Sequence, residues 1–178
     1  MCVDLTGSDI RHLFELLDKK LERRGVTGEL HVVGGAVMCI VLNARTSTRD
    51  VDALFAPTNA LREAAAEVAT ELDLPSGWLN DSVKGFFSAN SDFETYLELD
   101  HLKVYAASPK YLLAMKALSM RIGEEFQDEN DVRFLLRHLN IESYDEAVSI
   151  VTKYYELERL PQKTLCALQE MLPSPDPD

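Results

Sequence analysis

The sequence predicts a small α+β domain followed by a helical part. Apolar residues recur at helical spacing near the start and through the last third of the chain, and between these stretches they alternate with polar residues or form short runs. The expected order is helix, strand, helix, strand, helix, two strands and then helices alone, which indicates a small mixed or antiparallel sheet flanked by helices. We place the sheet domain at residues 1–107, a helical part packed on it at 108–172, and a disordered tail at 173–178.

Composition limits the classes of function. The 178 residues include 30 acidic and 18 basic side chains, giving a formal net charge of -12, so nucleic acid would have to be bound by a local basic patch. The three cysteines are scattered without zinc-ligand spacing, which favours a reducing, cytoplasmic setting. No apolar run approaches the roughly 20 residues of a membrane span, and no signal peptide is evident, so we expect no membrane association.

The first elements are a helix, a strand and a second helix. Helical spacing of apolar residues follows Ser8, the expected N-cap, and Gly25 ends that helix. Leu30–Val33 is expected to form a short buried strand that stops at Gly34–Gly35, and the apolar segment Ala36–Leu42 is expected to be helical.

A second strand follows a polar loop at residues 43–49. In Val51–Phe55, apolar residues alternate with polar ones and continue a pattern that includes Asp50 and Asp52, as expected for a half-exposed strand. Pro57 ends this strand. Both aspartates therefore belong to one face of it.

The rest of the sheet domain comprises a helix and a hairpin. Asn59 is a candidate cap for an alanine-rich helix that reaches about Leu72, and Trp78–Asp81 is expected to form a loop or a short helix. Phe93–Ala106 contains two strands joined by a tight turn at Asp100–His101, because the parity of the apolar positions changes there.

Each helix of the C-terminal part has its own start signal. The helices are expected from Ser108–Pro109 to about Arg121, over the residues after Asp128 and Asp131, from the Ser143-x-x-Glu146 capping box to about Glu158, and onward from Pro161.

The D-x-D and the glycine pair suggest a site for metal and phosphate. Same-face residues on a strand lie roughly 6.5–7 Å apart, so Asp50 and Asp52 can converge on one cation. Their hard oxygen atoms suit Mg²⁺ or Mn²⁺, completed by water and substrate phosphates. Gly34 and Gly35 can present backbone N–H groups to an anion. Each feature alone is common in solvated strands and turns, and it is their joint arrangement that favours a function.

The runs G-G-A-V and A-R-T-S-T-R-D-V-D-A-L-F resemble the signature of the nucleotidyltransferase superfamily, which has the DNA polymerase β-like fold. Within it the chain is most similar to a bacterial branch that includes abortive-infection toxins of toxin–antitoxin pairs and small relatives. The resemblance continues through residues 78–86, 102–116 and 121–132 and covers the chain to about residue 140. It implies that residues 1–107 form a nucleotidyltransferase core.

The resemblance implies roles for the motif residues. Gly34 and Gly35 with Ser47 would bind nucleotide phosphates, and Asp50 and Asp52 would hold Mg²⁺ and act in catalysis. The cofactor expected is therefore Mg²⁺, or Mn²⁺ in its place.

Further residues have two interpretations each. The resemblance implies that Lys116 reaches the triphosphate and that Asp131 is the late acidic residue of the branch, with Asp128 a weaker candidate. Lys116 interrupts an apolar helix face, and the structural alternative is a lysine whose stem lies on the core. Arg45 could bind a phosphate or form an ion pair with Asp50.

Glu94, Glu98 and Asp100 compete for the third carboxylate that polymerase β-like enzymes carry on a following strand. The implied activity is metal-dependent transfer of a nucleotidyl group from an NTP to an RNA such as the 3′ end of tRNA, to a protein or to a small molecule, with an antitoxin protein as partner if the chain is a toxin. The alternative is a catalytically inactive nucleotide-binding or protein-interaction module of the same fold.

Overall fold

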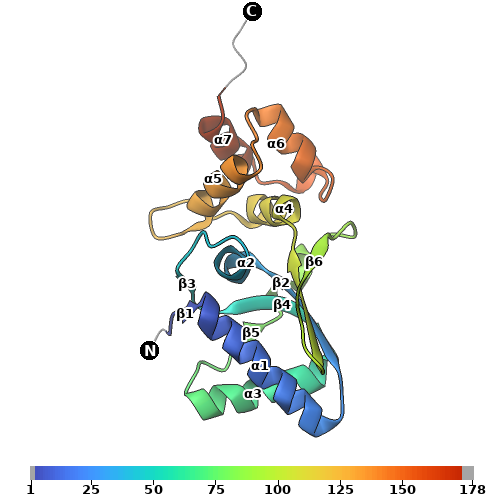
Figure 1. Cartoon of the computed structure of the whole chain (residues 1–178). Coiled ribbons are helices and arrows are strands. Elements are labelled where there is room, and N and C mark those ends of the chain that lie inside the picture. The colour runs from blue at the N-terminus through green and yellow to red at the C-terminus, as the bar shows by residue number, and fades with distance from the viewer. Residues whose placement is uncertain (1–2, 174–178) are drawn as a thin grey trace, which may run out of the picture. The chain divides into compact units, whose positions relative to one another are not determined.

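The computed structural model describes residues 3–173 and divides the chain into two compact units (Figure 1). The first, here called the sheet unit, comprises Met1–Gly85 and Phe93–Ala107. The second, the helical unit, comprises Phe86–Asp92 and Ser108–Asp178. Of the tail expected at 173–178, only Pro173 lies within the described residues. No helix in the described part of the chain is long and apolar enough to cross a membrane.

The sheet unit contains a mixed sheet flanked by helices, which confirms the predicted α+β class. The central strand β2 (Gly28–Val33) pairs antiparallel with β4 (Val51–Ala56) and parallel with β7 (Leu102–Ala107). The edges are β5 (Leu79–Asn80), parallel to β4, and β6 (Phe93–Glu98), antiparallel to β7. A separate short pair joins β1 (Leu5–Thr6) to β3 (Ser47–Thr48).

Helices α1 (Gly7–Arg24) and α3 (Thr58–Leu72) pack against each other and cover one face of the sheet. A Cβ on Gly28 would meet the side chains of Leu21 on α1 and Leu61 on α3, which identifies the covered face. Strand alternation then places the buried side chains of β4 on this face and Asp52 on the other. We call the second face the Asp52 face.

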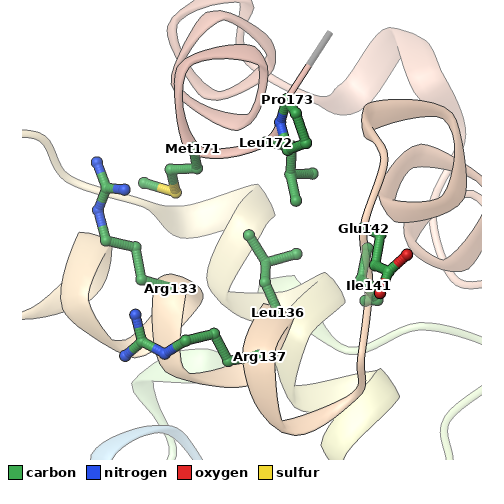
Figure 2. Close-up of a pocket in the computed structure, with 8 residues that line it drawn as sticks. All are labelled: Arg133, Leu136, Arg137, Ile141, Glu142, Met171, Leu172 and Pro173. Carbon is green, nitrogen blue, oxygen red and sulfur yellow. The ribbon is translucent and has the colours of Figure 1, made fainter. Parts of the chain in front are cut away.

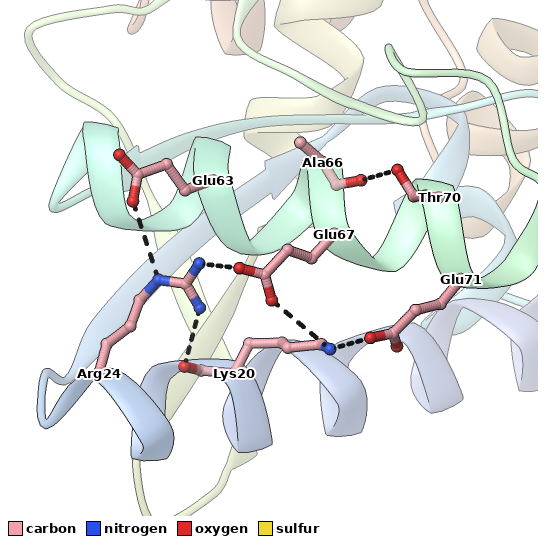
Figure 3. A network of polar contacts seen from close by, with 7 residues as sticks. All are labelled: Lys20, Arg24, Glu63, Ala66, Glu67, Thr70 and Glu71. Atoms are coloured by element: carbon pink, nitrogen blue, oxygen red, sulfur yellow. Dashed lines mark hydrogen bonds and ion pairs between the residues drawn. The ribbon is translucent and has the colours of Figure 1, made fainter.

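The polar contacts between α1 and α3 centre on a buried lysine (Figure 3). The Lys20 residue is 5% exposed and its ammonium pairs with Glu71 and, at 3.5 Å, with Glu67. Arg24 also pairs with Glu67 and donates a hydrogen bond of 3.1 Å to the Lys20 carbonyl. Its Nε lies 3.9 Å from Glu63. These contacts join α1 to α3 through cations on α1 and partly exposed glutamates on α3.

Two helix starts differ from the prediction. The N-cap of α1 is Thr6 and not Ser8: the Thr6 hydroxyl accepts a hydrogen bond from the Asp9 N–H, and the Asp9 carboxylate accepts one from the Thr6 N–H. This reciprocal pair satisfies two end groups, which a serine two residues later cannot do. Helix α3 begins at Thr58, directly after Pro57, so Asn59 is not its cap.

The segment predicted as a loop or short helix at 78–81 instead contains β5, followed by the 3₁₀ helix η1 (Ser82–Phe86). The Trp78 carbonyl accepts a hydrogen bond of 2.6 Å from Val51 N–H. The Trp78 indole is buried and donates to the Ala65 carbonyl at 3.0 Å. Tertiary contacts with β4 and α3 therefore hold this segment extended.

The helical unit contains α4 (Pro109–Ser119), α5 (Asp128–His138), α6 (Tyr144–Val151) and α7 (Gln162–Met171), with a 3₁₀ turn η2 (Leu157–Arg159) before α7. The predicted cap of α4 is confirmed, because the Ser108 hydroxyl accepts a hydrogen bond from Tyr111 N–H at 3.3 Å. Ser143 caps α6, but the Glu146 carboxylate accepts from Glu142 N–H and does not complete the box on Ser143.

Helix α6 ends at Val151, earlier than the predicted Glu158. The carbonyls that a longer helix would use are bonded elsewhere: Ser88 Oγ donates to the Tyr154 carbonyl at 2.5 Å, and Asn90 Nδ2 donates to the Lys153 carbonyl at 3.1 Å. The buried Tyr155 hydroxyl donates to the Phe86 carbonyl. The segment Phe86–Asp92 thus fixes the chain after α6.

Candidate functional site

Asp52 lies beside the glycine pair. It is opposite Val33 in the β2–β4 register, and Val33 directly precedes Gly34. A Cβ added to Gly34 would lie 3.3 Å from Asp52 Oδ2. Gly34 has a φ of 68°, a conformation that side chains other than glycine rarely adopt. Gly34 therefore lets the backbone turn next to a carboxylate.

Asp50 immediately precedes β4 and has the same side-chain parity as Asp52. Both are half-buried. Asn80, opposite Asp52 on β5, donates a hydrogen bond of 3.5 Å to Asp50 Oδ2. The sequence predicted a loop or a short helix around Asn80, and the pairing of β5 with β4 is what brings this residue to the aspartates.

Gly35 packs closely against two side chains. A Cβ there would lie 2.8 Å from Arg45 Nη1 and 2.8 Å from Thr48 Oγ1. Any other residue at this position would force these two groups to move. The glycine pair opens α2 (Gly34–Ile40), and Val33 supplies no side-chain cap. A carboxylate, an uncapped backbone turn, a guanidinium and a hydroxyl therefore meet here.

The hydroxyl against Gly35 belongs to Thr48, not to Ser47, the residue named by the resemblance. Thr48 is 8% exposed, and Ser47 is half-buried and pairs with Thr6 across the β1–β3 ladder. The run T-S-T contains three hydroxyls, on Thr46, Ser47 and Thr48, and only the packing identifies the one that lies against Gly35.

Glu94 lies on the wrong face to be a third carboxylate beside Asp52. It is opposite Ala106 on β7, Ala106 is opposite Val32, and Val32 is opposite Ala53. Directly opposed residues share a face, so Glu94 belongs to the face of Ala53, away from Asp52.

Glu98 and Asp100 lie at the far end of the sheet. After an irregularity between Thr95 and Leu97, Glu98 is opposite Lys103 and forms an ion pair with it at 3.1 Å. Lys103 is opposite Glu29, which lies four residues, or about 13 Å, from Val33 along β2. Asp100 belongs to the hairpin turn beyond Glu98. None of the three candidates lies beside Asp52.

Aromatic side chains from β2, β6 and β7 lie together on the Asp52 face. His31 stacks on Tyr105 with ring centroids 4.8 Å apart and meets Phe93 edge-on at 4.9 Å. Burial lowers the pKa of His31, and the charge of Glu29 opposes this in part. A mainly neutral imidazole at pH 7 follows.

The acidic groups present fit one hard cation. Among residues 3–173 no group of three or more histidine, cysteine, aspartate or glutamate side chains could hold a metal ion. Asp52 on β4 and Asp50 directly before it supply carboxylate oxygens, the donor type that Mg²⁺ prefers when water and phosphate fill its other positions. The donor chemistry of the pair therefore suits Mg²⁺.

Lys116 is held by two carboxylates inside the helical unit. Its ammonium lies 2.7 Å from Asp131 Oδ2 and 3.5 Å from Asp128 Oδ1. All three residues are buried, with exposed fractions of 8%, 3% and 5% for Lys116, Asp131 and Asp128. The sequence anticipated an anion for Lys116, and the structure supplies two from α5.

Arg121 completes this cluster from the segment between α4 and α5. Its Nε and backbone N–H donate to Asp128 Oδ2 at 2.9 and 3.1 Å, and its guanidinium lies over the Phe126 ring. Burial raises the pKa of Asp128, but the Arg121 hydrogen bonds and the Lys116 charge outweigh it and hold the pKa below its usual value. The two buried carboxylates are therefore balanced by the buried Lys116 and by the exposed Arg121.

The predicted site residues thus form two sets, each described within its own unit. The sheet unit carries Gly34, Gly35, Arg45, Ser47, Asp50 and Asp52, and the helical unit carries Lys116 and Asp131. Comparisons with protein-family models, with curated proteins and with solved structures found no match for the chain.

Proposed function

We propose that the protein is a metal-dependent nucleotidyltransferase. The observation that carries the proposal is the convergence at the glycine pair, where Asp52 lies against Gly34 while Arg45 and Thr48 lie against Gly35. Carboxylates for a cation and a guanidinium for phosphate, on either side of the half-buried glycine pair, suit the binding of an NTP–Mg²⁺ complex.

In this proposal Asp50 and Asp52 would hold Mg²⁺, which would supply positive charge for the phosphate oxygens. Arg45 and the backbone at Gly35 bind phosphate oxygens, with Thr48 and Ser47 as neighbouring hydroxyls. An acceptor hydroxyl oxygen bonds to the α-phosphorus as the bond to the pyrophosphate oxygen breaks. The hydroxyl proton leaves to solvent, because Glu94, Glu98 and Asp100 all lie away from Asp52.

Lys116 is the proposed contact to the triphosphate and Asp131 its positioning carboxylate. To bind phosphate, the Lys116 ammonium would exchange Asp131 Oδ2, 2.7 Å away, for a phosphate oxygen. Asp128 would remain neutralised by Arg121 during this exchange. The buried Asp131 would lose its cation in this exchange, so the exchange would cost energy that phosphate binding has to supply.

The acceptor is proposed to be an RNA 3′ end, a protein or a small molecule, and a toxin role would add an antitoxin protein as partner. The net charge of -12 opposes a broad RNA-binding surface. An RNA acceptor would consequently be bound through few contacts, with affinity that falls steeply as salt rises.

A second candidate is an inactive module that binds nucleotide without transferring it. The observation that favours it is the placement of Glu94, Glu98 and Asp100 away from Asp52, which leaves the aspartate pair without the usual third carboxylate. Such a module would bind NTP but release no pyrophosphate.

The test is incubation of the protein with each α-labelled NTP, Mg²⁺ or Mn²⁺, and total cell extract. Label should enter an acceptor and pyrophosphate should appear, and Asp52→Asn should abolish both without changing the melting temperature of the free protein. Asp73→Asn is the matched control, because Asp73 is an exposed C-cap in the left-handed conformation that asparagine also adopts. NTP binding without pyrophosphate would favour the inactive module, and equal activity of wild type and Asp52→Asn would refute the proposed site.

A further inference from the structure

A pocket in the helical unit has an aliphatic floor and a charged rim (Figure 2). Its volume is about 510 Å³, and α5, the loop after it and the end of α7 line it. Leu136, Ile141 and Leu172 form the floor, and each is at most 7% exposed. The rim is divided by charge: Figure 2 shows the guanidinium groups of Arg133 and Arg137 on one side and the Glu142 carboxylate on the other.

The two arginines form a like-charged pair. Arg133 and Arg137 lie one turn apart on α5, where side chains are neighbours and like charges repel. Both are exposed, and among residues 3–173 neither forms an ion pair with a carboxylate. The helix dipole favours Arg137 in the last turn, but it does not account for Arg133 in the middle of the helix.

The charge around this pocket is opposite in sign to that of the whole chain. The chain has 30 acidic against 18 basic side chains, whereas the charged residues that line the pocket are two arginines and one glutamate. Here two exposed arginines lie on one side of an apolar pocket. The combination is complementary to a ligand that carries carboxylates next to an aliphatic group.

We propose that this pocket binds a short acidic peptide segment of a partner protein. An aliphatic side chain of the segment enters the floor over Leu136, and flanking aspartate or glutamate carboxylates accept bidentate hydrogen bonds from Arg133 and Arg137. Glu142 on the opposite side sets the direction of the segment, because it repels a carboxylate placed there.

Peptide chemistry fits the pocket better than nucleic acid does. The lining contains no aromatic ring on which a base could stack, and its floor offers aliphatic carbon in place of groups that read base edges. Glu142 would also oppose a continuous phosphate backbone that crosses the pocket. These points distinguish the pocket from an RNA-binding site.

The test uses the full chain and a short fluorescent peptide that alternates leucine and aspartate, with binding followed by anisotropy at low salt. Two control peptides replace every aspartate by lysine or every leucine by serine. The leucine–aspartate peptide should bind at least about tenfold more tightly than either control, because each control removes one half of the complementarity. The assay contains no nucleotide, so its outcome is independent of transferase activity.

Variants locate the binding. Arg133→Gln and Arg137→Gln should each weaken the leucine–aspartate peptide about fivefold, the effect of one rim ion pair. Arg23→Gln, which makes the same charge change on an exposed residue of α1, should leave binding unchanged. The double variant Arg133→Glu/Arg137→Glu should prefer the leucine–lysine peptide.

Three outcomes overturn the proposal. They are no binding of the leucine–aspartate peptide up to about 1 mM, equal binding by wild type and the double glutamate variant, and displacement of the peptide by oligouridylate at lower concentration than by unlabelled peptide. The last outcome would assign the arginines to RNA.

Discussion

Replacement of Lys116 by methionine should destabilise the helical unit strongly. Methionine keeps the length and apolar stem of the lysine but removes its charge. The Lys116 and Asp131 side chains are 10% and 4% exposed, so Asp131 would lose a cation 2.7 Å away in a place that water reaches poorly. Removal of one partner from a buried ion pair costs about 3–5 kcal/mol.

Arg121 remains bound to Asp128 in this variant, so the destabilisation comes from Asp131. Asp128 keeps its hydrogen bonds of 2.9 and 3.1 Å from Arg121 in the variant, whereas Asp131 loses the lysine. Replacing the second partner as well, in Lys116→Met/Asp131→Leu, exchanges the pair for apolar groups of similar size. This double variant should recover stability to within about 1–2 kcal/mol of the wild type, since apolar replacement of a whole buried pair is often neutral.

Urea denaturation followed by far-ultraviolet circular dichroism measures these free energies. Lys153→Met is the control, because Lys153 is exposed and its hydrogen bonds within residues 3–173 are made by its backbone N–H and carbonyl. The reasoning would be refuted by a loss below about 1 kcal/mol in Lys116→Met, the range of an exposed pair, or by a double variant no more stable than the single one. The same data are needed to interpret activity, because an unfolded Lys116 variant would be inactive for structural reasons.

Three further predictions concern the sheet unit and the start of α4. A hydrogen bond from Arg24 lowers the pKa of the Glu67 carboxyl below its usual 4.5. The ionised Glu67 therefore stabilises the fold above that pH, and this stabilisation is lost as pH falls through the lowered pKa. Glu67→Gln should flatten the acid side of the curve of melting temperature against pH. Gly35→Ala should cost about 1–3 kcal/mol by overpacking, whereas Gly77→Ala, where a Cβ meets nothing within 4 Å, should not destabilise, as thermal melts would show. Ser108→Ala removes the cap of α4 and should cost about 1–2 kcal/mol in urea denaturation.

Elements specified by local signals were predicted well. The alternation across Val51–Phe55 gave β4, and Ser108–Pro109 gave the start of α4, because a strand face and a capped proline start depend on neighbouring residues alone. Elements that depend on distant partners were missed. The segment at Trp78 is extended because Val51 N–H donates a hydrogen bond to the Trp78 carbonyl. Helix α6 ends early because the side chains of Ser88 and Asn90 donate hydrogen bonds to carbonyls in the residues that follow it.

The candidate site also combines features that neighbouring residues determine with features that distant partners determine. The proximity of Asp52 to the glycine pair follows from adjacent strands and was foreseen in outline. The face of the sheet on which Glu94 lies could not be predicted, because it depends on the β6–β7 register. A shift of one residue in that register moves a side chain to the opposite face. The partners of Lys116 were also hidden, since their distance depends on how α5 packs on α4. The roles of all these residues in catalysis stay predictions.

The segment Phe86–Asp92 has a consequence for how the protein can be dissected. The chain leaves the sheet unit after Gly85, supplies Ser88 and Asn90 to the helical unit, and returns to form β6. A fragment that begins at residue 108 would therefore lack the donors that bond the carbonyls of Lys153 and Tyr154, and one that ends at 107 would carry those donors without their acceptors. A cut after residue 107 keeps every residue of the sheet unit together but separates Phe86–Asp92 from the rest of the helical unit, so no single cut in the polypeptide yields both units whole.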